Sequence, residues 1–273
     1  MNESSEGQLQ VASQDRKIAK NYFHVLWRAP ALLVWIIVMP LVFFLFKLVG
    51  SAFHKEIPHF FHQGVQKILG LRVKYSGELH KEHPTLFVSN HISYLDVFVL
   101  GGIRAYFIAK SEVAGWPVLG QLARFQNTLF IERSAGKARQ QLKIMQSHLR
   151  EGNSLILFPE GTSTDGVHVE PFKSSLFEAA NLEESETRVS IQAITVAYTH
   201  QAGKKMNQEM RDYYAWYATM PFGPHFRNLF ALQKVDVKVH FHPVCYLDQF
   251  ESRKQCADHC ELQVSNKLTQ FTA

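Results

Sequence analysis

The chain has 273 residues, of which 46% are hydrophobic and 19% are charged, and its formal net charge is +5. This apolar fraction excludes an intrinsically disordered chain, because it is large enough to build a sizeable core. The length fits one large domain, alone or with an appendage, and the positive charge favours anionic partners such as a lipid surface or a phosphate-bearing substrate. Nucleic acid is not expected as a partner, because the basic residues are dispersed and no aromatic–basic recognition motif is present.

The N-terminal part combines a polar leader with a long apolar run. Residues 1–16 are polar, and we expect them to form a disordered leader. Residues 29–46 carry no charge over eighteen positions, which is the lower limit for crossing a bilayer. Pro30 and Pro40 argue against one straight span, so a spanning helix and a re-entrant insertion both stay open. We therefore predict a membrane-associated helical segment over residues 17–70.

The end of that segment, residues 59–70, mixes apolar side chains with histidines and Lys67. It is interpreted either as an amphipathic helix at the membrane interface or as a surface helix of the following domain. His59 and His62 are interpreted as surface residues rather than metal ligands.

From residue 71 onward, short apolar runs alternate with helical patterns. The clearest helical pattern covers residues 137–150, where apolar side chains recur on one face and Gly152 follows the end. The runs interpreted as strands are residues 71–77, 85–89, 105–109, 128–132, 154–158, 190–198 and 235–241. This alternation predicts one α/β domain over residues 71–273, with a central, mostly parallel or mixed sheet covered by helices.

Polar side chains follow four of the predicted strands. They are His91 and Asp96, then Lys110, then Arg133, and finally Glu160 with Gly161 and Thr162. Ligands of such sheets gather beyond the carboxyl ends of the strands. We therefore expect these four loops to converge on one site.

His91 and Asp96 lie five positions apart, and this spacing has two interpretations. Asp96 follows Ser93 by three residues, which has the form of a capping box at a helix start. Alternatively, the imidazole is a base and the carboxylate orients it. The stretch alone leaves both interpretations open.

Three motifs occur in a fixed order. His91 and Asp96 form a His-x4-Asp motif, residues 130–133 read F-I-E-R, and residues 158–162 read F-P-E-G-T. Together they resemble the glycerolipid acyltransferase family, which includes the 1-acylglycerol-3-phosphate acyltransferases, over roughly residues 73–198. The resemblance implies an enzyme that moves an acyl chain from acyl-CoA or acyl carrier protein to a lysolipid hydroxyl. No metal and no further cofactor are implied.

The resemblance also implies roles for single residues. His91 is expected to act as the general base, and Asp96 to hold its tautomer and stabilise the imidazolium. Arg133, Lys110, Glu160, Gly161 and Thr162 are expected to bind substrate. Arg133 suits a phosphate, Glu160 suits a substrate hydroxyl or a neighbouring cation, and the turn at Gly161–Thr162 is one of two candidate sources of oxyanion donors, the other being the helix start after His91.

Two positions depart from the family pattern and bear on the acceptor. Ser163 stands where the third motif usually continues with arginine, and Ala193 stands where a later apolar motif usually carries proline. Residues 213–230 resemble a bacterial subset that includes the acyltransferases completing ornithine lipids. The preferred acceptor is 1-acyl-glycerol-3-phosphate, and the alternative is a lyso-ornithine lipid. A non-catalytic lipid-binding membrane protein and a thioesterase are the rivals from other classes.

The chain has three cysteines, all in its last thirty residues. Cys245, Cys256 and Cys260 lack the paired CxxC spacing of zinc sites, so no metal is expected. Coenzyme A and carrier-protein thioesters are cytosolic. We therefore expect the catalytic domain on the cytoplasmic face of a bacterial inner membrane.

Overall fold

The computed structural model of the protein describes residues 22–132, 135–182 and 187–273. The predicted polar leader, residues 1–16, and the candidate site residue Arg133 lie outside these ranges. The centre of the structure is one sheet with the strand order β1-β8-β6-β2-β5-β3-β4, and β7 pairs with β6. The strands are β1 Leu71–Gly77, β2 Thr85–Ser89, β3 Tyr106–Lys110, β4 Leu129–Ile131, β5 Leu155–Leu157, β6 Ser190–Gln201, β7 Lys204–Lys205 and β8 Val235–Cys245.

The sheet is mixed, as predicted. Neighbouring strands run parallel except where β6 meets β8 and β7. All the strands that the apolar runs indicated are present. The segment between the antiparallel strands β6 and β8 carries α7 (Gln208–Arg211) and α8 (Phe222–Leu229).

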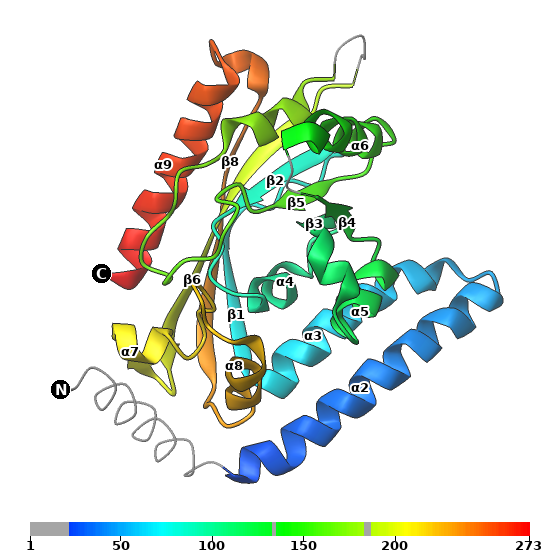
Figure 1. Ribbon diagram of the computed structural model, residues 1–273, viewed down its shortest axis with the longest axis vertical. Coiled ribbons are helices and arrows are strands. Elements are labelled where there is room, and N and C mark those ends of the chain that lie inside the picture. Colours follow the sequence, from blue (N-terminus) through cyan, green and yellow to red (C-terminus); the bar gives the residue numbers. More distant parts are fainter. Residues whose placement is uncertain (1–21, 133–134, 183–186) are drawn as a thin grey trace.

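Helices cover both faces of the sheet, which confirms the predicted layers (Figure 1). On one face Phe87 and its register partner Ile156 join a core with residues of α3, α4 and α8. On the other face Leu86 and Leu155 join a core with residues of α6 and α9. This alternation follows from the period of two along a strand. The helices are α3 Ile57–Leu69, α4 Leu95–Leu100, α5 Leu119–Phe125, α6 Ala138–Arg150, α7 Gln208–Arg211, α8 Phe222–Leu229 and α9 Arg253–Thr272, with 3-10 turns η2 Ala52–Glu56, η3 Ser111–Gly115, η4 Ala135–Lys137, η5 Ser174–Ala180 and η6 Leu247–Gln249.

The N-terminal helix α2, Tyr22–Leu48, continues through Pro30 and Pro40. Each proline removes only one backbone hydrogen bond, and packing against the domain supports the helix on both sides of them. Trp35 lies between the two prolines, and its Nε1 donates to the carbonyl of Phe61 in α3 at 3.0 Å. The helices approach closely there because Gly64 has no Cβ. A Cβ at this position would lie 2.1 Å from the Trp35 ring.

A second tie joins α2 to the end of α8. The buried guanidinium of Arg28 donates through Nη1 to the carbonyls of Leu232 and, at 3.4 Å, Phe230. These carbonyls belong to the turn after the last residue of α8, where a helix leaves acceptors without intrahelical donors. Arg28 therefore fixes the start of α2 against the turn that follows α8.

The rest of α2 presents apolar side chains outward. The helix is long and apolar enough over Phe23–Leu48 to cross a membrane, and little of it is buried against the domain. The most exposed large apolar side chains are Phe23, Leu26, Leu33, Val34, Leu41, Leu45 and Leu48. A continuous apolar surface of this extent is typical of membrane association.

Helix α3 belongs to the covering layer of the domain. Its Val65 and Leu69 are buried, and the helix packs on α4 and β1. The interpretation of His62 as a surface residue is wrong: its side chain is 2% exposed, and Nε2 lies 2.7 Å from Oε1 of Gln126. The 3.6-residue period places His62 on the same face as Val65 and Leu69, so it turns inward with them.

Candidate active site

Four parallel strands end at one edge of the sheet. They lie side by side in the order β2-β5-β3-β4, so their carboxyl ends open in the same direction. A cavity of about 870 Å³ lies there, and its lining includes His91, Lys110, Gly161 and Thr162. The structure thus brings together the loops after β2, β3 and β5. Asp96 and Glu160 lie behind the lining.

The imidazole of His91 is held from two directions. Its Nδ1 lies 3.0 Å from Oδ2 of Asp96, and its ring stacks on Phe158 with 4.1 Å between centroids and 20° between planes. A carboxylate only accepts hydrogen bonds, so Nδ1 carries the proton and Nε2 is the nitrogen that can accept one. The side chain is 22% exposed, so the ring remains accessible from the cavity.

Asp96 combines the two roles that its sequence position left open. Its Oδ2 also accepts the backbone N–H groups of Ile92 at 2.7 Å and Ser93 at 2.9 Å. Its Oδ1 accepts the hydroxyl of Tyr198 at 2.9 Å. The reciprocal bond from the serine side of a capping box is not formed, because Ser93 Oγ has no partner in the described parts of the chain. Four donors therefore fix one fully buried carboxyl group, which both shapes the turn and orients the imidazole.

The loop after β5, which begins with the F-P-E-G-T motif, forms hydrogen bonds with the backbone of His91. Oε1 of Glu160 accepts the His91 N–H at 2.6 Å, and the His91 carbonyl accepts the Thr164 N–H at 2.9 Å. Oε2 of Glu160 accepts the N–H of Glu170 at 2.7 Å. Both carboxyl oxygens thus contact backbone, whereas the sequence pointed to a substrate hydroxyl or a cation. Burial raises the pKa of Glu160 to about 8, although the two N–H donors act in the opposite direction.

The turn after Glu160 depends on glycine. Gly161 has a φ of +77°, a left-handed conformation that other residues rarely adopt. A Cβ at this position would also lie 2.2 Å from Nζ of Lys173. Lys173 comes from the loop that leads into η5 and lines the same cavity as Lys110. Two ammonium groups therefore border the space next to the histidine.

Comparison with known proteins identifies the family of this chain. A sequence model of the acyltransferase family matches residues 71–198. The lyso-ornithine lipid O-acyltransferase of Brucella abortus is 35% identical over 81% of this chain and 85% of its own length, and that of Rhodobacter capsulatus is 38% identical over 74% of this chain and 72% of its own length. The 1-acyl-sn-glycerol-3-phosphate acyltransferase of Neisseria gonorrhoeae is 29% identical over 69% of this chain and 70% of its own length.

This chain belongs to the acyltransferase family. Its fold has a solved counterpart in the 1-acyl-sn-glycerophosphate acyltransferase PlsC from Thermotoga maritima. The TM-score is 0.67, and the match covers 93% of this chain and 97% of that one. With 20% identity, this likeness speaks to the fold only.

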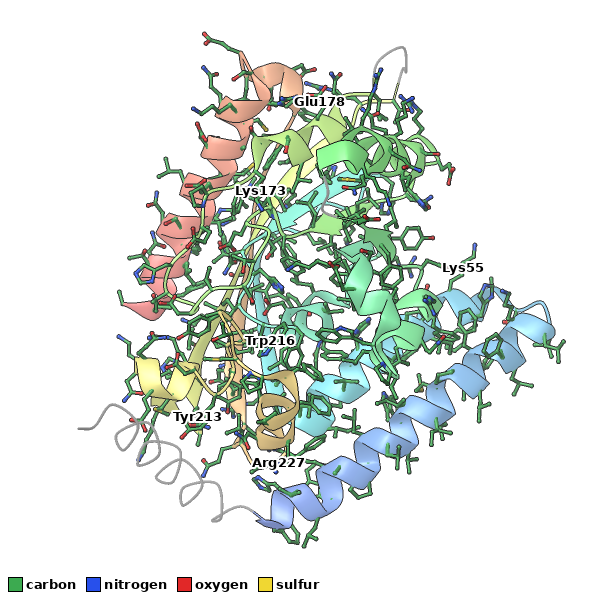
Figure 2. All side chains as sticks on the ribbon, viewed as in Figure 1. Lys55, Lys173, Glu178, Tyr213, Trp216 and Arg227 are labelled. Atoms are coloured by element: carbon green, nitrogen blue, oxygen red, sulfur yellow. The ribbon has the colours of Figure 1, made fainter. Side chains whose placement is uncertain are left out.

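The acyltransferase carries a loop over the site that motif reasoning did not place there. The backbone N–H of Trp216 donates to the carbonyl of Ile92 at 2.9 Å, and Ser163 Oγ donates to the carbonyl of Trp216. Figure 2 shows Trp216 and Lys173 on two different loops near the middle of the molecule. The run of aromatic residues at 213–217 was the available signal, but nothing in its spacing indicates which loop it contacts.

Tyr198 was also missed. It is the ninth residue of β6, fully buried, and its hydroxyl reaches Asp96 from a strand far along the chain. Its position in an apolar strand pattern indicates only a core tyrosine. The pairing of β6 with β2 brings it to the site.

Outside the cavity, the acyltransferase buries three thiols together. Sγ atoms of Cys245, Cys256 and Cys260 all lie within 4.8 Å of one another. The end of β8 meets one face of α9 at this point, where residues four apart along the helix share that face. All three side chains belong to the second core of the domain.

Proposed function

We propose that this acyltransferase is a lyso-ornithine lipid O-acyltransferase, which esterifies the hydroxyl of a lysolipid with an amino-acid headgroup. The observation that carries the proposal is the hydrogen bond of Ser163 to the loop of Trp216. Its hydroxyl binds the carbonyl of Trp216, so the place of the usual arginine holds an aromatic loop instead of a guanidinium. The two relatives with this activity and 35% and 38% identity support the same acceptor. The acceptor preferred from the sequence, 1-acyl-glycerol-3-phosphate, becomes the second candidate.

The proposed reaction needs one base and no enzyme nucleophile. The acceptor oxygen attacks the thioester carbonyl carbon while its proton passes to Nε2 of His91. The ester C–O bond forms and the C–S bond breaks, and the departing thiolate takes the proton from His91. Asp96 stabilises the imidazolium between these two transfers.

The developing oxyanion needs N–H donors that are not already engaged. The N–H groups of His91, Ile92 and Ser93 donate to Glu160 and Asp96. Those of Thr162 and Ser163 donate to no acceptor within the described parts of the chain. We therefore assign the oxyanion to the N–H groups after Gly161.

The charged lining of the cavity suits a zwitterionic acceptor. In a lyso-ornithine lipid the acylated hydroxyl lies on an amide-linked fatty acid, and the ornithine keeps one carboxylate and one ammonium group. Lys110 and Lys173 offer cations for the carboxylate, and Glu112 offers an anion for the ammonium group. These three side chains and the histidines are the titratable lining groups among the described residues, apart from tyrosines.

The second candidate, 1-acyl-glycerol-3-phosphate, rests on the same two lysines. A phosphate that is nearly dianionic would use Lys110 and Lys173, with Arg133 as a further partner. The relative from Neisseria gonorrhoeae, at 29% identity, favours this acceptor. In this case Arg133→Ala would raise KM for the lysolipid far more than for the acyl donor, by roughly ten- to a hundredfold.

The proposed location is the cytoplasmic face of the bacterial inner membrane, with α2 as the anchor. The donor is proposed to be acyl-CoA or acyl carrier protein, both of which are cytosolic. Protease digestion of intact spheroplasts tests this orientation. The catalytic domain should resist digestion until the membrane is opened, and digestion in intact spheroplasts would contradict it.

Competition between the two lysolipids tests the acceptor. Membranes containing the protein are supplied with a labelled acyl donor and equal amounts of lyso-ornithine lipid and 1-acyl-glycerol-3-phosphate. We expect the label in the ornithine lipid, and none with His91→Ala. Preferential labelling of phosphatidic acid would transfer the assignment to the second candidate. Release of free fatty acid alone would indicate a thioesterase, and no turnover would indicate a lipid-binding protein.

A further inference from the structure

We propose that Trp116 and Trp216 form a recognition site for the ammonium group of the acceptor headgroup. This inference rests on the proposed function, since it concerns the headgroup of the same acceptor. We call these two residues the tryptophan pair. Both line the cavity that contains His91, and their ring centroids lie 6.1 Å apart with 84° between the planes. Two indole rings at this angle form a corner rather than a stack.

The position of the tryptophan pair relative to the base is fixed by backbone contacts. The N–H of Trp216 donates to Ile92, the residue after His91, at 2.9 Å. The carbonyl of Trp216 accepts Ser163 Oγ from the loop that holds the proposed oxyanion donors. Trp216 is therefore tied to both catalytic loops at once. A headgroup that contacts its ring has a defined relation to the hydroxyl that reacts.

Further aromatic rings support the pair from behind. Phe222 at the start of α8 packs on both, with centroids 5.0 Å from Trp116 and 6.0 Å from Trp216. Phe222 is not part of the cavity lining. Tyr94, which does line the cavity, lies 5.7 Å from Trp216 and turns its hydroxyl to His225 at 2.8 Å. The corner is thus built before a ligand arrives, and little side-chain freedom is lost when one binds.

The carboxyl group in the cavity lining and the indole rings indicate a cation as the ligand of the tryptophan pair. Glu112 is the only residue with a carboxyl group among the described residues of the lining, and it precedes Trp116 by four residues in the segment of η3. Indole rings attract cations through their negative faces, and tryptophan does so most strongly of the aromatic side chains. A carboxylate in the same cavity lining as two indoles attracts an ammonium group. Lys110 and Lys173 also line the cavity and offer positive charge to the carboxylate of the same headgroup.

The test compares two acceptors that differ in the charge at issue. One is lyso-ornithine lipid, and the other carries glutamine in place of ornithine, which has nearly the same length and no ammonium group. The ratio of their kcat/KM values is measured for the wild-type enzyme, Trp216→Leu, Trp216→Phe and Trp116→Leu. We expect the wild type to prefer ornithine by about three- to thirtyfold, the range of a cation–π contact from exposed to desolvated.

The variants locate the source of that preference. Trp216→Leu and Trp116→Leu should each reduce the ratio towards one by lowering turnover of the ornithine lipid, and Trp216→Phe should lie between. Trp27→Leu is the matched control, since Trp27 is an exposed tryptophan of α2 outside the cavity lining, and it should leave the ratio unchanged. If one leucine variant fails to fold in a thermal melt, the other carries the test.

Two results would overturn the inference, and they are distinguishable. A wild-type enzyme that acylates both amino-acid lysolipids equally, or leucine variants that keep the full preference, would refute the tryptophan pair while the proposed function stands. A wild-type enzyme that acylates neither, but accepts 1-acyl-glycerol-3-phosphate, would refute the proposed function and the inference with it.

Discussion

Glu160 accepts the backbone N–H of His91 at 2.6 Å, so the two main motifs of the sequence form one structural unit. The contact joins loops that lie about seventy residues apart, and the bond from Thr164 N–H to the His91 carbonyl closes it from the other side. The position of the His91 imidazole is therefore set by contacts of its backbone as well as by Asp96. We therefore infer that Glu160 is a positioning residue, whose substitution would affect the proposed chemistry through His91.

Glu160→Gln should lower kcat by a larger factor than it changes KM for the acyl donor. Both oxygens of Glu160 can accept an N–H group even when the acid is neutral, whereas the NH₂ group of an amide accepts none, so one of the contacts to His91 or Glu170 is lost. The loss of a buried hydrogen bond corresponds to about 1–3 kcal/mol, so we expect activity to fall by roughly ten- to a hundredfold. Steady-state kinetics measures this, and unchanged kcat would contradict the positioning role.

The same substitution should change how stability depends on pH. Burial raises the pKa of Glu160 from 4.5 to about 8, so the folded protein favours the neutral form. A raised pKa gives a stabilising contribution that is complete below about 4.5 and is lost as pH rises through about 8. Between these values Tm should fall more steeply for the wild type than for Glu160→Gln, which does not titrate. Parallel Tm profiles of the two proteins would contradict the raised pKa.

Asp96→Asn separates the structural role of the carboxyl group from its proposed catalytic role. Asparagine can still accept the N–H groups of Ile92 and Ser93, so the turn should survive and Tm should change little. The negative charge that stabilises the imidazolium is lost, and we expect kcat to fall by about 10²–10⁴-fold. Activity near the wild-type level would show that Asp96 serves only the turn.

Tyr198→Phe should leave Oδ1 of Asp96 without its donor from β6. A buried acceptor that loses its partner destabilises a protein by about 1–3 kcal/mol, and the freed carboxyl group should also reduce kcat. Tyr214→Phe is the matched control: this tyrosine is equally buried and donates to the carbonyl of Gln233, away from Asp96. Both variants should lose stability, and only Tyr198→Phe should lose turnover. Equal kcat values in the two variants would refute the link to Asp96.

Ser163→Arg should shift acceptor use from the amino-acid lysolipid to the phosphate lysolipid. The substitution removes the bond to the Trp216 carbonyl and adds a guanidinium suited to phosphate. Ser163→Ala removes the bond alone and serves as the control. The ratio of kcat/KM for the two lysolipids should move towards the phosphate lysolipid, or reverse in its favour, only in the arginine variant. The same ratio in both variants would contradict it.

Deletion of residues 1–47 should move the catalytic domain out of the membrane fraction or leave it aggregated. The deletion removes the apolar surface of α2 and exposes the face of α3 that Trp35 covers at Gly64. Fractionation of cells with a carbonate wash measures the change. Arg28→Gln keeps the helix and should stay in membranes, while its Tm falls because acceptors after α8 lose a donor. Full retention of the deleted protein in washed membranes would show that α2 is not the main anchor.

The sequence by itself determined the layers of this protein and most of its candidate site. Apolar runs with a period of two and helical runs with a period of 3.6 are local, so they indicated the strands, α6 and the covering of both sheet faces. The order of the motifs placed His91, Asp96, Lys110 and the Glu160 turn at strand ends. Since parallel strands end at one edge of a sheet, convergence there followed from the predicted fold.

Only the tertiary structure decided what each side chain contacts. Tyr198 reaches Asp96 because β6 pairs with β2, and Trp216 reaches the loop of His91 because the segment between α7 and α8 borders the cavity. Glu160 turns to backbone N–H groups that belong to a distant loop. Such contacts join residues far apart in the chain, and no local period or spacing encodes them. They arise from the packing of the elements, which selects among the partners that the sequence leaves open.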